Sequence, residues 1–424
     1  MDETKLAPKL LAELQKPRPQ DAEAEPIPVI IRYKPDVIRS QAVKEGIEAH
    51  FVYKLTPTVA AAAPGHDIAD LTDEGDIDYI WLDEEVHTCL DRSVQQIGVP
   101  PIWAAGYTGA GIKVAVVDTG IDPDHPDFSG RIVAGASFVG DDYRDGNGHG
   151  THVAGTVAGS GAAQDSKYKG VAPGALLYIA QSLDRHGGGS MSTVMAGIEW
   201  AVEQGVQVIN MSLGGAGPSD GQDALSLTCN AAVERGIVVC VAAGNAGPGG
   251  ETVGAPGAAA DVITIGAVDR QDGIARFSSR GPTADGRRKP DVCLPGTDIV
   301  SARAAGTSMG TPLDTLYTAA SGTSMATPHA AGLAALLLQA NPSLQPAEIK
   351  QVLMDTALNL GQDPNAQGAG RVQAEHAFRA ILGEEPPVTE PTPTPPIDET
   401  PGDGEETPTK KGCLPTFLIS LIGQ

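Results

Sequence analysis

The sequence predicts an α/β protein: a three-layer sandwich with a mostly parallel central sheet, preceded by a small α+β unit of ferredoxin-like type. Apolar runs such as IKVAVVD (residues 112–118) and GIVVCVAAG (residues 236–244) have almost no polar alternation, which is typical of strands covered on both faces. Helical segments such as STVMAGIEWAVEQG (residues 192–205) lie between these runs, as a parallel sheet requires. The 424 residues suffice for one large domain and smaller pieces.

The first 92 residues are expected to form an arm and the small unit. Residues 1–25 are polar and interrupted by proline, so we expect a mobile arm, in which Leu6, Leu10, Leu11 and Leu14 could form a short helical stripe. Within residues 26–92, strands are expected at residues 27–35, 51–55 and 76–86, and helices at residues 36–50 and 66–75. This order is typical of a split βαβ arrangement.

Residues 93–383 are expected to form the large sandwich. Besides the runs quoted above, strands are expected at residues 174–183, 206–213 and 262–268. In such sheets the functional side chains gather at the carboxyl ends of the strands. Residues 384–411 are rich in Pro, Thr and Glu and are expected to be a disordered linker, because they cannot bury a core. A short apolar tail follows over residues 412–424.

The bulk properties exclude several classes of function. A formal net charge of −24 and a pI near 4.6 argue against nucleic acid and anionic membranes as partners, since both attract basic proteins. The five cysteines are an odd number without metal-ligand spacing, so we expect neither a disulfide framework nor a zinc site. The N-terminus lacks the pattern of a signal peptide, and no run of 18 apolar residues predicts a transmembrane segment. The expected location is therefore the cytoplasm, with non-classical export as the alternative.

Three segments place residue types suited to acyl transfer beside strand ends or helix starts. Asp118 ends an apolar strand before a glycine turn, where an isolated aspartate can simply cap the turn. The stretch DGNGHGTHVAGTVAG (residues 145–159) puts His149 and His152 at the start of a helix of small residues, although a lone histidine is more often structural. Asn245 follows another strand between glycines, where its amide could donate to an oxyanion.

A candidate nucleophilic serine occurs twice, in two nearly identical heptads. GTSMGTP contains Ser308, and GTSMATP contains Ser324. Ser324 precedes HAAGLAALLLQA, a run of mostly strong helix formers, so it is expected at a helix N-terminus, where N–H groups and the dipole favour developing negative charge. Ser308 precedes LDTLYTAASG, which β-branched residues and glycine interrupt, and is expected on a surface loop. The sequence therefore predicts Ser324 as the nucleophile.

The order aspartate, histidine, serine in these contexts resembles the subtilisin-type serine proteases, or subtilases. The resemblance rests on VAVVDTGID, HGTHVAGT, VINMSLGG, AAGN and GTSMATPHAAG and covers residues 93–383. It implies a serine endopeptidase that works through an acyl-enzyme. In the roles that it implies, Asp118 orients the imidazole, His149 is the base, Ser324 is the nucleophile and Asn245 is the side-chain donor of the oxyanion hole. His152 then lies on the inner face of its helix as a structural residue.

The resemblance also implies where a substrate binds. Five positions match the edge strand and the opposite wall between which an extended substrate lies: Ser212, Leu213, Gly214, Gly187 and Gly188. Gly254 matches the floor of the pocket for the P1 residue, the residue before the cut, and glycine there leaves the pocket open. Ala246 supplies no charge. We therefore expect a broad preference for large apolar P1 residues.

The first 90 residues resemble, more loosely, the inhibitory propeptide of the family. The resemblance implies a zymogen whose propeptide inhibits its own enzyme until the enzyme removes it, here between Thr88 and Ser93. Polypeptides are the expected substrates of a monomeric enzyme. Two alternatives remain open: an inactive subtilase that serves as a binding or scaffold module, and a surface or assembly protein that works through residues 384–424.

The family pattern of metal binding is only partly present. Many subtilases bind calcium through an Asn-rich loop after the histidine helix, but GSGAAQDSKYKG (residues 159–170) lacks the usual ligands. Asp127 matches one calcium carboxylate. The chemistry is expected to need no cofactor, and a structural calcium stays an open expectation.

Overall fold

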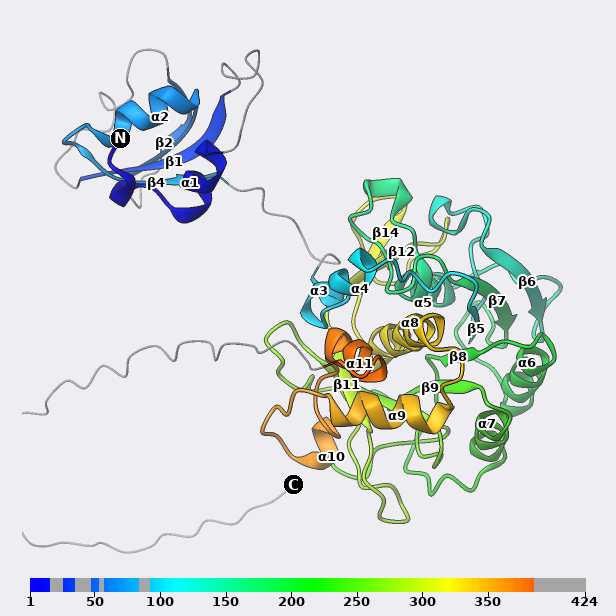
Figure 1. Cartoon of the computed structure of the whole chain (residues 1–424). Coiled ribbons are helices and arrows are strands. Elements are labelled where there is room, and N and C mark those ends of the chain that lie inside the picture. The colour runs from blue at the N-terminus through cyan, green and yellow to red at the C-terminus, as the bar shows by residue number, and fades with distance from the viewer. Residues whose placement is uncertain (16–25, 35–46, 53–56, 84–91, 385–424) are drawn as a thin grey trace, which may run out of the picture.

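The computed structural model describes residues 1–15, 26–34, 47–52, 57–83 and 92–384 (Figure 1). These residues form two units, each with its own sheet and core. Within these ranges, no helix has both the length and the apolar character needed to cross a bilayer.

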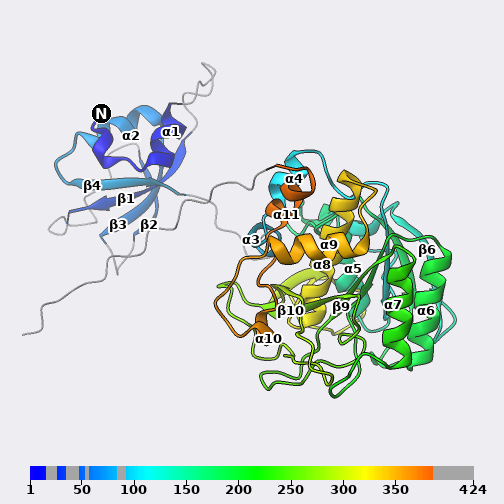
Figure 2. The ribbon, with the colours of Figure 1, turned by 60° about the horizontal axis from the view of Figure 1, so that its bottom comes forward.

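The N-terminal unit is a four-stranded antiparallel sheet with helices on one face (Figure 2). Its strands are β1 (Ile27–Tyr33), β2 (Glu48–Val52), β3 (Thr58–Ala63) and β4 (Ile77–Leu82), in the order β2-β3-β1-β4. Its helices are η1 (Glu3–Lys5), α1 (Pro8–Leu14) and α2 (Gly65–Thr72). Every second residue of β1 is buried in a core that α1 and α2 share. The strand order is that of a ferredoxin-like unit.

The structure corrects the expected mobile arm over residues 1–15. Leu6 and Leu10 are buried, and Leu11 and Leu14 pack against the same core. The polar residues between these leucines indicated a mobile arm. Leucines spaced three and four apart nevertheless give α1 an apolar stripe, and the sheet covers it.

Two strands of this unit also differ from expectation. Residues 48–50, expected to end a helix, belong to β2. Strand β3, TVAAAA, was not predicted because alanine favours helices, yet it pairs with both β1 and β2 and is mostly buried. The expected helix over residues 36–46, the strand end near Val86, residues 88–91 of the segment in which the cut is expected, and residues 385–424 of the linker and tail lie outside the described residues.

The large unit contains a seven-stranded sheet in which every neighbouring pair is parallel. The strands are β5 (Lys113–Asp118), β6 (Ile132–Ser137), β7 (Leu176–Gln181), β8 (Val208–Met211), β9 (Val238–Ala242), β10 (Ile263–Val268) and β11 (Val292–Pro295). Their order is β11-β10-β9-β8-β5-β7-β6. The predicted fold class is confirmed. The edge strands β6 and β11 were not predicted, because one consists mostly of small, partly exposed residues and the other has four residues.

Helices cover both faces of this sheet and make the three layers (Figure 2). Side chains of β5 alternate between two cores: Val114 and Val116 pack with α5 (His149–Ala158) and α8 (Thr323–Ala340), whereas Ala115 and Val117 pack with α6 (Met191–Glu203) and α7 (Ala224–Glu234). The remaining helices are α3 (Ser93–Gln96), α4 (Pro100–Ala104), η4 (Pro126–Phe128), η5 (Ala162–Gln164), α9 (Pro346–Asp355), α10 (Pro364–Gln367) and α11 (Ala374–Ile381).

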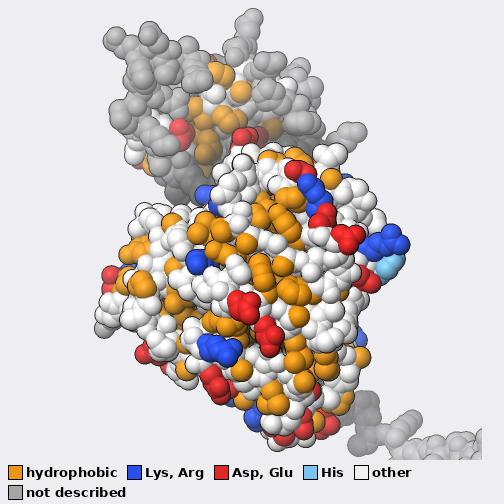
Figure 3. All heavy atoms as spheres, turned by 90° about the vertical axis from the view of Figure 1, so that its right-hand side faces the viewer, with side chains coloured by type: hydrophobic (Ala, Val, Ile, Leu, Met, Phe, Trp, Pro, Cys, Tyr) orange, Lys and Arg blue, Asp and Glu red, His pale blue; other side chains and the backbone are white. Residues whose placement is uncertain are grey.

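A second, antiparallel sheet leads into α8. It consists of β12 (Ile299–Ala302), β13 (Thr311–Pro312) and β14 (Tyr317–Ala320) in the order β12-β14-β13. In the large sheet, β5, β8 and β9 are neighbours, so their carboxyl ends meet at one edge. Apolar side chains also gather on the face that carries α6 and α7, where Met191 and Leu227 are about half exposed (Figure 3).

Candidate active site

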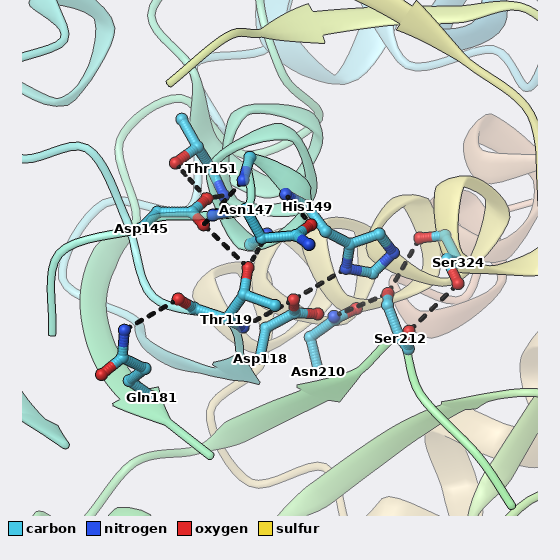
Figure 4. A network of polar contacts seen from close by, with 12 residues as sticks. Asp118, Thr119, Asp145, Asn147, His149, Thr151, Gln181, Asn210, Ser212 and Ser324 are labelled. Atoms are coloured by element: carbon cyan, nitrogen blue, oxygen red, sulfur yellow. Dashed lines mark hydrogen bonds and ion pairs between the residues drawn. The ribbon is translucent and has the colours of Figure 1, made fainter. Parts of the chain in front are cut away.

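A buried carboxylate and a histidine meet where β5 ends and α5 begins (Figure 4). Asp118 is the last residue of β5 and is fully buried. Its Oδ1 accepts hydrogen bonds from Thr119 N at 2.7 Å and from His149 Nδ1 at 2.7 Å. Because an ionised carboxylate can only accept, Nδ1 carries the hydrogen, and in the neutral imidazole Nε2 then has a free lone pair. The His149 side chain is 22% exposed, so the imidazole lies at the boundary between core and groove.

Glycine permits this close approach of strand end and helix start. A Cβ at Gly150, the second residue of α5, would lie 2.2 Å from the carbonyl oxygen of Gly120, in the turn after Asp118. Gly120 itself has a φ of +109°, which side chains other than glycine rarely adopt. The glycines of DTG and HGTH therefore bring the backbones together and set the carboxylate against the imidazole.

The surroundings of His149 favour its protonated form. Burial opposes protonation, but the charge of Asp118, the hydrogen bond to Asp118 and the charge of Asp145 together raise the pKa of the imidazole above its ordinary value. A base with a raised pKa holds a proton more firmly once it has taken it. This environment suits a residue that must become an imidazolium during a reaction.

Ser324 lies in the first turn of α8, across the same groove. Its Oγ donates to the carbonyl oxygen of Ser212 at 3.0 Å, and Ser212 Oγ donates to the carbonyl oxygen of Ser324 at 2.8 Å. Within the described chain no hydrogen bond joins Ser324 Oγ to His149. Both side chains line one groove of about 520 Å³. Hydrogen bonds between catalytic groups are often long or poorly aligned without substrate, and a rotation about the Cα–Cβ bond of Ser324 would redirect its hydroxyl.

Asn245 presents its amide group to the same place. Its Oδ1 accepts from Thr323 N at 2.9 Å and from Thr323 Oγ1 at 3.0 Å. These two donors fix the orientation of the amide, so its NH₂ faces the other way as a donor. The N–H of Ser324 has no acceptor among the described residues, as is usual in the first turn of a helix. Two N–H donors, of the Asn245 amide and of the Ser324 main chain, are therefore available on residues that line the same groove.

A smaller cavity of about 270 Å³ opens beside Ser324. Its walls come from residues 213–217 and 242–246, and no charged side chain lines it. Gly254 also lines this cavity. A Cβ there would lie 2.4 Å from the carbonyl oxygen of Gly215, so only glycine fits this close approach of two cavity walls, and its part in keeping the pocket open stays a prediction.

The larger groove continues away from Ser324 between two segments. Ser212, Leu213 and Gly214 form one side, and Gly187 and Gly188 form part of the other, as the resemblance implied. Four apolar side chains of its lining were not predicted: Leu183, Met191, Val194 and Leu225. Met191 and Val194 lie on α6 and Leu225 lies on α7, at spacings that are typical of helix residues facing a core. The one sequence signal near these side chains is the run GGGS just before α6, whose residues also line the groove.

His152 and Ser308 are not part of the cluster formed by Asp118, His149, Ser324 and Asn245. His152 is buried and its Nε2 bonds to the carbonyl oxygen of Ile299 at 2.8 Å, while burial lowers the pKa of its imidazole to about 4. Ser308 is exposed on the loop between β12 and β13. The duplicated heptad therefore has one copy at a helix start and one on a surface loop.

Asp127 is held by protein groups on every side. Both of its carboxylate oxygens accept from the hydroxyl of Tyr317, at 3.0 and 2.9 Å, and the guanidinium of Arg131 donates to its main-chain carbonyl. Among the residues that the structure describes, no group of three or more His, Cys, Asp or Glu side chains could hold a metal ion. The carboxylate of Asp127 is thus paired with the Tyr317 hydroxyl in this structure, and a structural calcium stays a prediction.

Known proteins resemble the large unit closely. The model of the subtilase family matches residues 109–370. Serine protease AprX of Bacillus subtilis (strain 168) is 40% identical in an alignment of 334 positions that covers 72% of this chain and 75% of AprX. Subtilisin E of the same organism is 40% identical in an alignment of 336 positions that covers 77% of this chain and 81% of that protein. A solved structure of a cold-adapted subtilisin-like serine proteinase is 34% identical with a TM-score of 0.51, covering 63% of this chain and 88% of that one.

Proposed function

The chain belongs to the subtilase family and is a serine endopeptidase, and on that premise we propose which of its residues carry the reaction. Asp118, His149 and Ser324 form the catalytic triad. Asn245 Nδ2 and the N–H of Ser324 form the oxyanion hole. The observation that carries this proposal is the 2.7 Å hydrogen bond from His149 Nδ1 to the buried carboxylate of Asp118, in the groove that Ser324 lines.

The proposed reaction uses groups of the chain alone. Ser324 turns its hydroxyl from the Ser212 carbonyl to His149 Nε2, which takes the proton as Oγ attacks the substrate carbonyl. The carbonyl oxygen becomes an oxyanion between the two N–H donors. His149 then gives the proton to the leaving amine, and an acyl-enzyme remains on Ser324. A water molecule attacks the ester with His149 again as the base, which releases the acid and restores the serine.

The two serines of the duplicated heptad provide the direct test. Ser324→Ala is expected to lower kcat on a chromogenic peptide by about 10⁶, the loss known for the serine of a subtilisin, whereas Ser308→Ala should retain activity. A serine-directed phosphonyl reagent should label the wild type and not Ser324→Ala. A folded wild-type protein that neither cleaves the peptide nor reacts would favour the alternative, an inactive subtilase acting as a scaffold.

We further propose that the 270 Å³ cavity receives a large apolar P1 side chain. Its lining has no charge to pair with lysine or arginine, and burying an unpaired cation is costly. Backbone groups at Ser212–Gly214 line the groove next to this cavity, which supports their pairing with an extended substrate. Peptides ending in Phe or Leu should be cut with a higher kcat/KM than matched peptides ending in Arg. The reverse order would contradict this assignment of the cavity.

The N-terminal unit supports a third proposal, that the enzyme is made as a self-processing zymogen. A compact α+β unit precedes the protease unit, and residues 84–91 connect them. The cut is proposed between Thr88 and Ser93. Mass spectrometry should find wild-type protein without its first ~90 residues and Ser324→Ala protein at full length. If the Ser324→Ala protein is also shortened, another protease makes the cut.

A further inference from the structure

Asp145 is a second buried carboxylate close to His149, and the proposed reaction does not use it. Its side chain is only 8% exposed. Oδ1 accepts hydrogen bonds from Thr119 Oγ1 at 2.9 Å, Asn147 N at 2.9 Å and Gly148 N at 2.7 Å. Oδ2 accepts from Thr151 N at 2.9 Å and Thr151 Oγ1 at 2.7 Å. Five donors on one carboxylate satisfy it fully inside the protein.

These donors come from both sides of the Asp118–His149 hydrogen bond (Figure 4). Thr119 directly follows Asp118, and its N–H donates to the Asp118 carboxylate at 2.7 Å. On the other side, the bonds to Gly148 N and to the Thr151 N–H hold the start of α5, where His149 lies. The Thr119 hydroxyl links the end of β5 directly to the start of α5, because it donates to Asp145 and accepts from Gly150 N at 2.9 Å.

We propose that Asp145 is a positioning residue for the proposed triad. Together with the Thr119 hydroxyl it holds the end of β5 against the start of α5, which keeps the carboxylate of Asp118 in register with the imidazole of His149. Its negative charge also stabilises the imidazolium that forms in the transition state. The inference deepens the proposed function and rests on that assignment of the triad.

The chemistry of the residue supports a role beyond capping a helix. A serine or asparagine could satisfy one or two N–H groups of a helix start without bringing a charge into the protein. A carboxylate is costly to bury. Burial lowers the pKa of His149 and Asp118 raises it, and the charge of Asp145 adds a smaller effect that also raises it. Two other groups lie near this start of α5 among the described residues: His152, on α5 itself, and the loop of Arg185, whose main-chain carbonyl accepts from Asn147 Nδ2 at 3.2 Å.

Two variants separate the geometric and the electrostatic parts of this role. Asp145→Asn keeps the shape of the side chain but removes its charge and one acceptor. Thr119→Val removes the hydroxyl that joins strand and helix and leaves the charge. Asp141→Asn is the matched control, because it removes a carboxylate from the exposed surface four residues away. Each variant is compared with wild type by kcat, KM, the pH dependence of kcat/KM, active-site titration and thermal melting.

Asp145→Asn is expected to lower kcat about 10- to 100-fold with little change in KM. It should also shift the acid limb of the pH profile to lower pH, because loss of the nearby negative charge makes His149 easier to deprotonate. Thr119→Val should lower kcat but leave the acid limb in place, and Asp141→Asn should change neither. A purely structural residue would lower the fraction of active enzyme without moving the limb.

An unchanged kcat or an unmoved acid limb in folded Asp145→Asn overturns the proposal. If that variant does not fold, Thr119→Val decides, and an unchanged kcat there overturns the geometric role. Failure of the triad assignment itself would look different, because Ser324→Ala measured alongside would then retain activity.

Discussion

Replacing Gly150 by alanine is expected to lower kcat/KM about 100-fold in a protein that still folds. A Cβ at this position would lie 2.2 Å from the carbonyl oxygen of Gly120 and 3.0 Å from its nitrogen. Both are backbone atoms of the turn after Asp118, so no flexible side chain can move aside. Ordinary contact begins near 3.4 Å, so the two backbones must part by roughly 1 Å.

This separation acts on the 2.7 Å hydrogen bond between Asp118 and His149, because the two residues lie on the two sides of the crowded contact. A misplacement of about 1 Å in a catalytic group can cost about 10² in rate. Overpacking in a well-packed region also costs roughly 1–3 kcal/mol of unfolding free energy. Alanine recovers about 1 kcal/mol of this through its higher helix propensity. Activity should therefore fall much more than stability.

The assay is the initial rate on a chromogenic peptide, with active-site titration to count competent molecules and a thermal melt to measure stability. Gly140→Ala is the matched control. Its Cβ would meet Ser137 Oγ at 3.6 Å and Gln181 Oε1 at 3.7 Å, which are ordinary contacts, and its kcat/KM should stay at the wild-type level. A wild-type kcat/KM for Gly150→Ala would refute the argument that glycine sets the contact between β5 and α5.

Three further outcomes are expected. The acid limb of kcat/KM should lie above pH 6.5, the ordinary pKa of histidine, because activity needs neutral His149 and its raised pKa keeps it protonated to higher pH; a midpoint below 6.5 would count against this. Asn245→Leu should lower kcat by about 10²–10³, the range measured for the corresponding donor of a subtilisin, with KM nearly unchanged; an unchanged kcat would remove Asn245 from the oxyanion hole. Tyr317→Phe should cost about 1–3 kcal/mol in urea unfolding, because it takes the hydroxyl from both oxygens of buried Asp127. Tyr107→Phe is its control, since that hydroxyl makes no hydrogen bond within the described chain; equal losses in the two variants would mean that the Asp127 contact contributes nothing.

Much of the fold was predictable because its signals are local. A strand covered on both faces is apolar at most positions without alternation, and β5, β7, β8, β9 and β10 follow that pattern. The choice between Ser308 and Ser324 was also local, since only Ser324 is followed by helix formers. The strand β3 was missed because alanine by itself favours helices, and the packing of α1 was missed because only the folded sheet supplies the surface that covers its leucines.

By itself the sequence determined the class of fold, the family resemblance and the identities of the residues proposed for the triad. Only the tertiary structure decided which end of the Asn245 amide donates, since Thr323 lies 78 residues away, and what surrounds Asp127, since Tyr317 lies 190 residues away. It also decided the connection made by Asp145. The physical reason is that a periodic pattern records which face of an element is buried. Which polar atoms meet depends on how distant segments pack, and no local pattern records that packing.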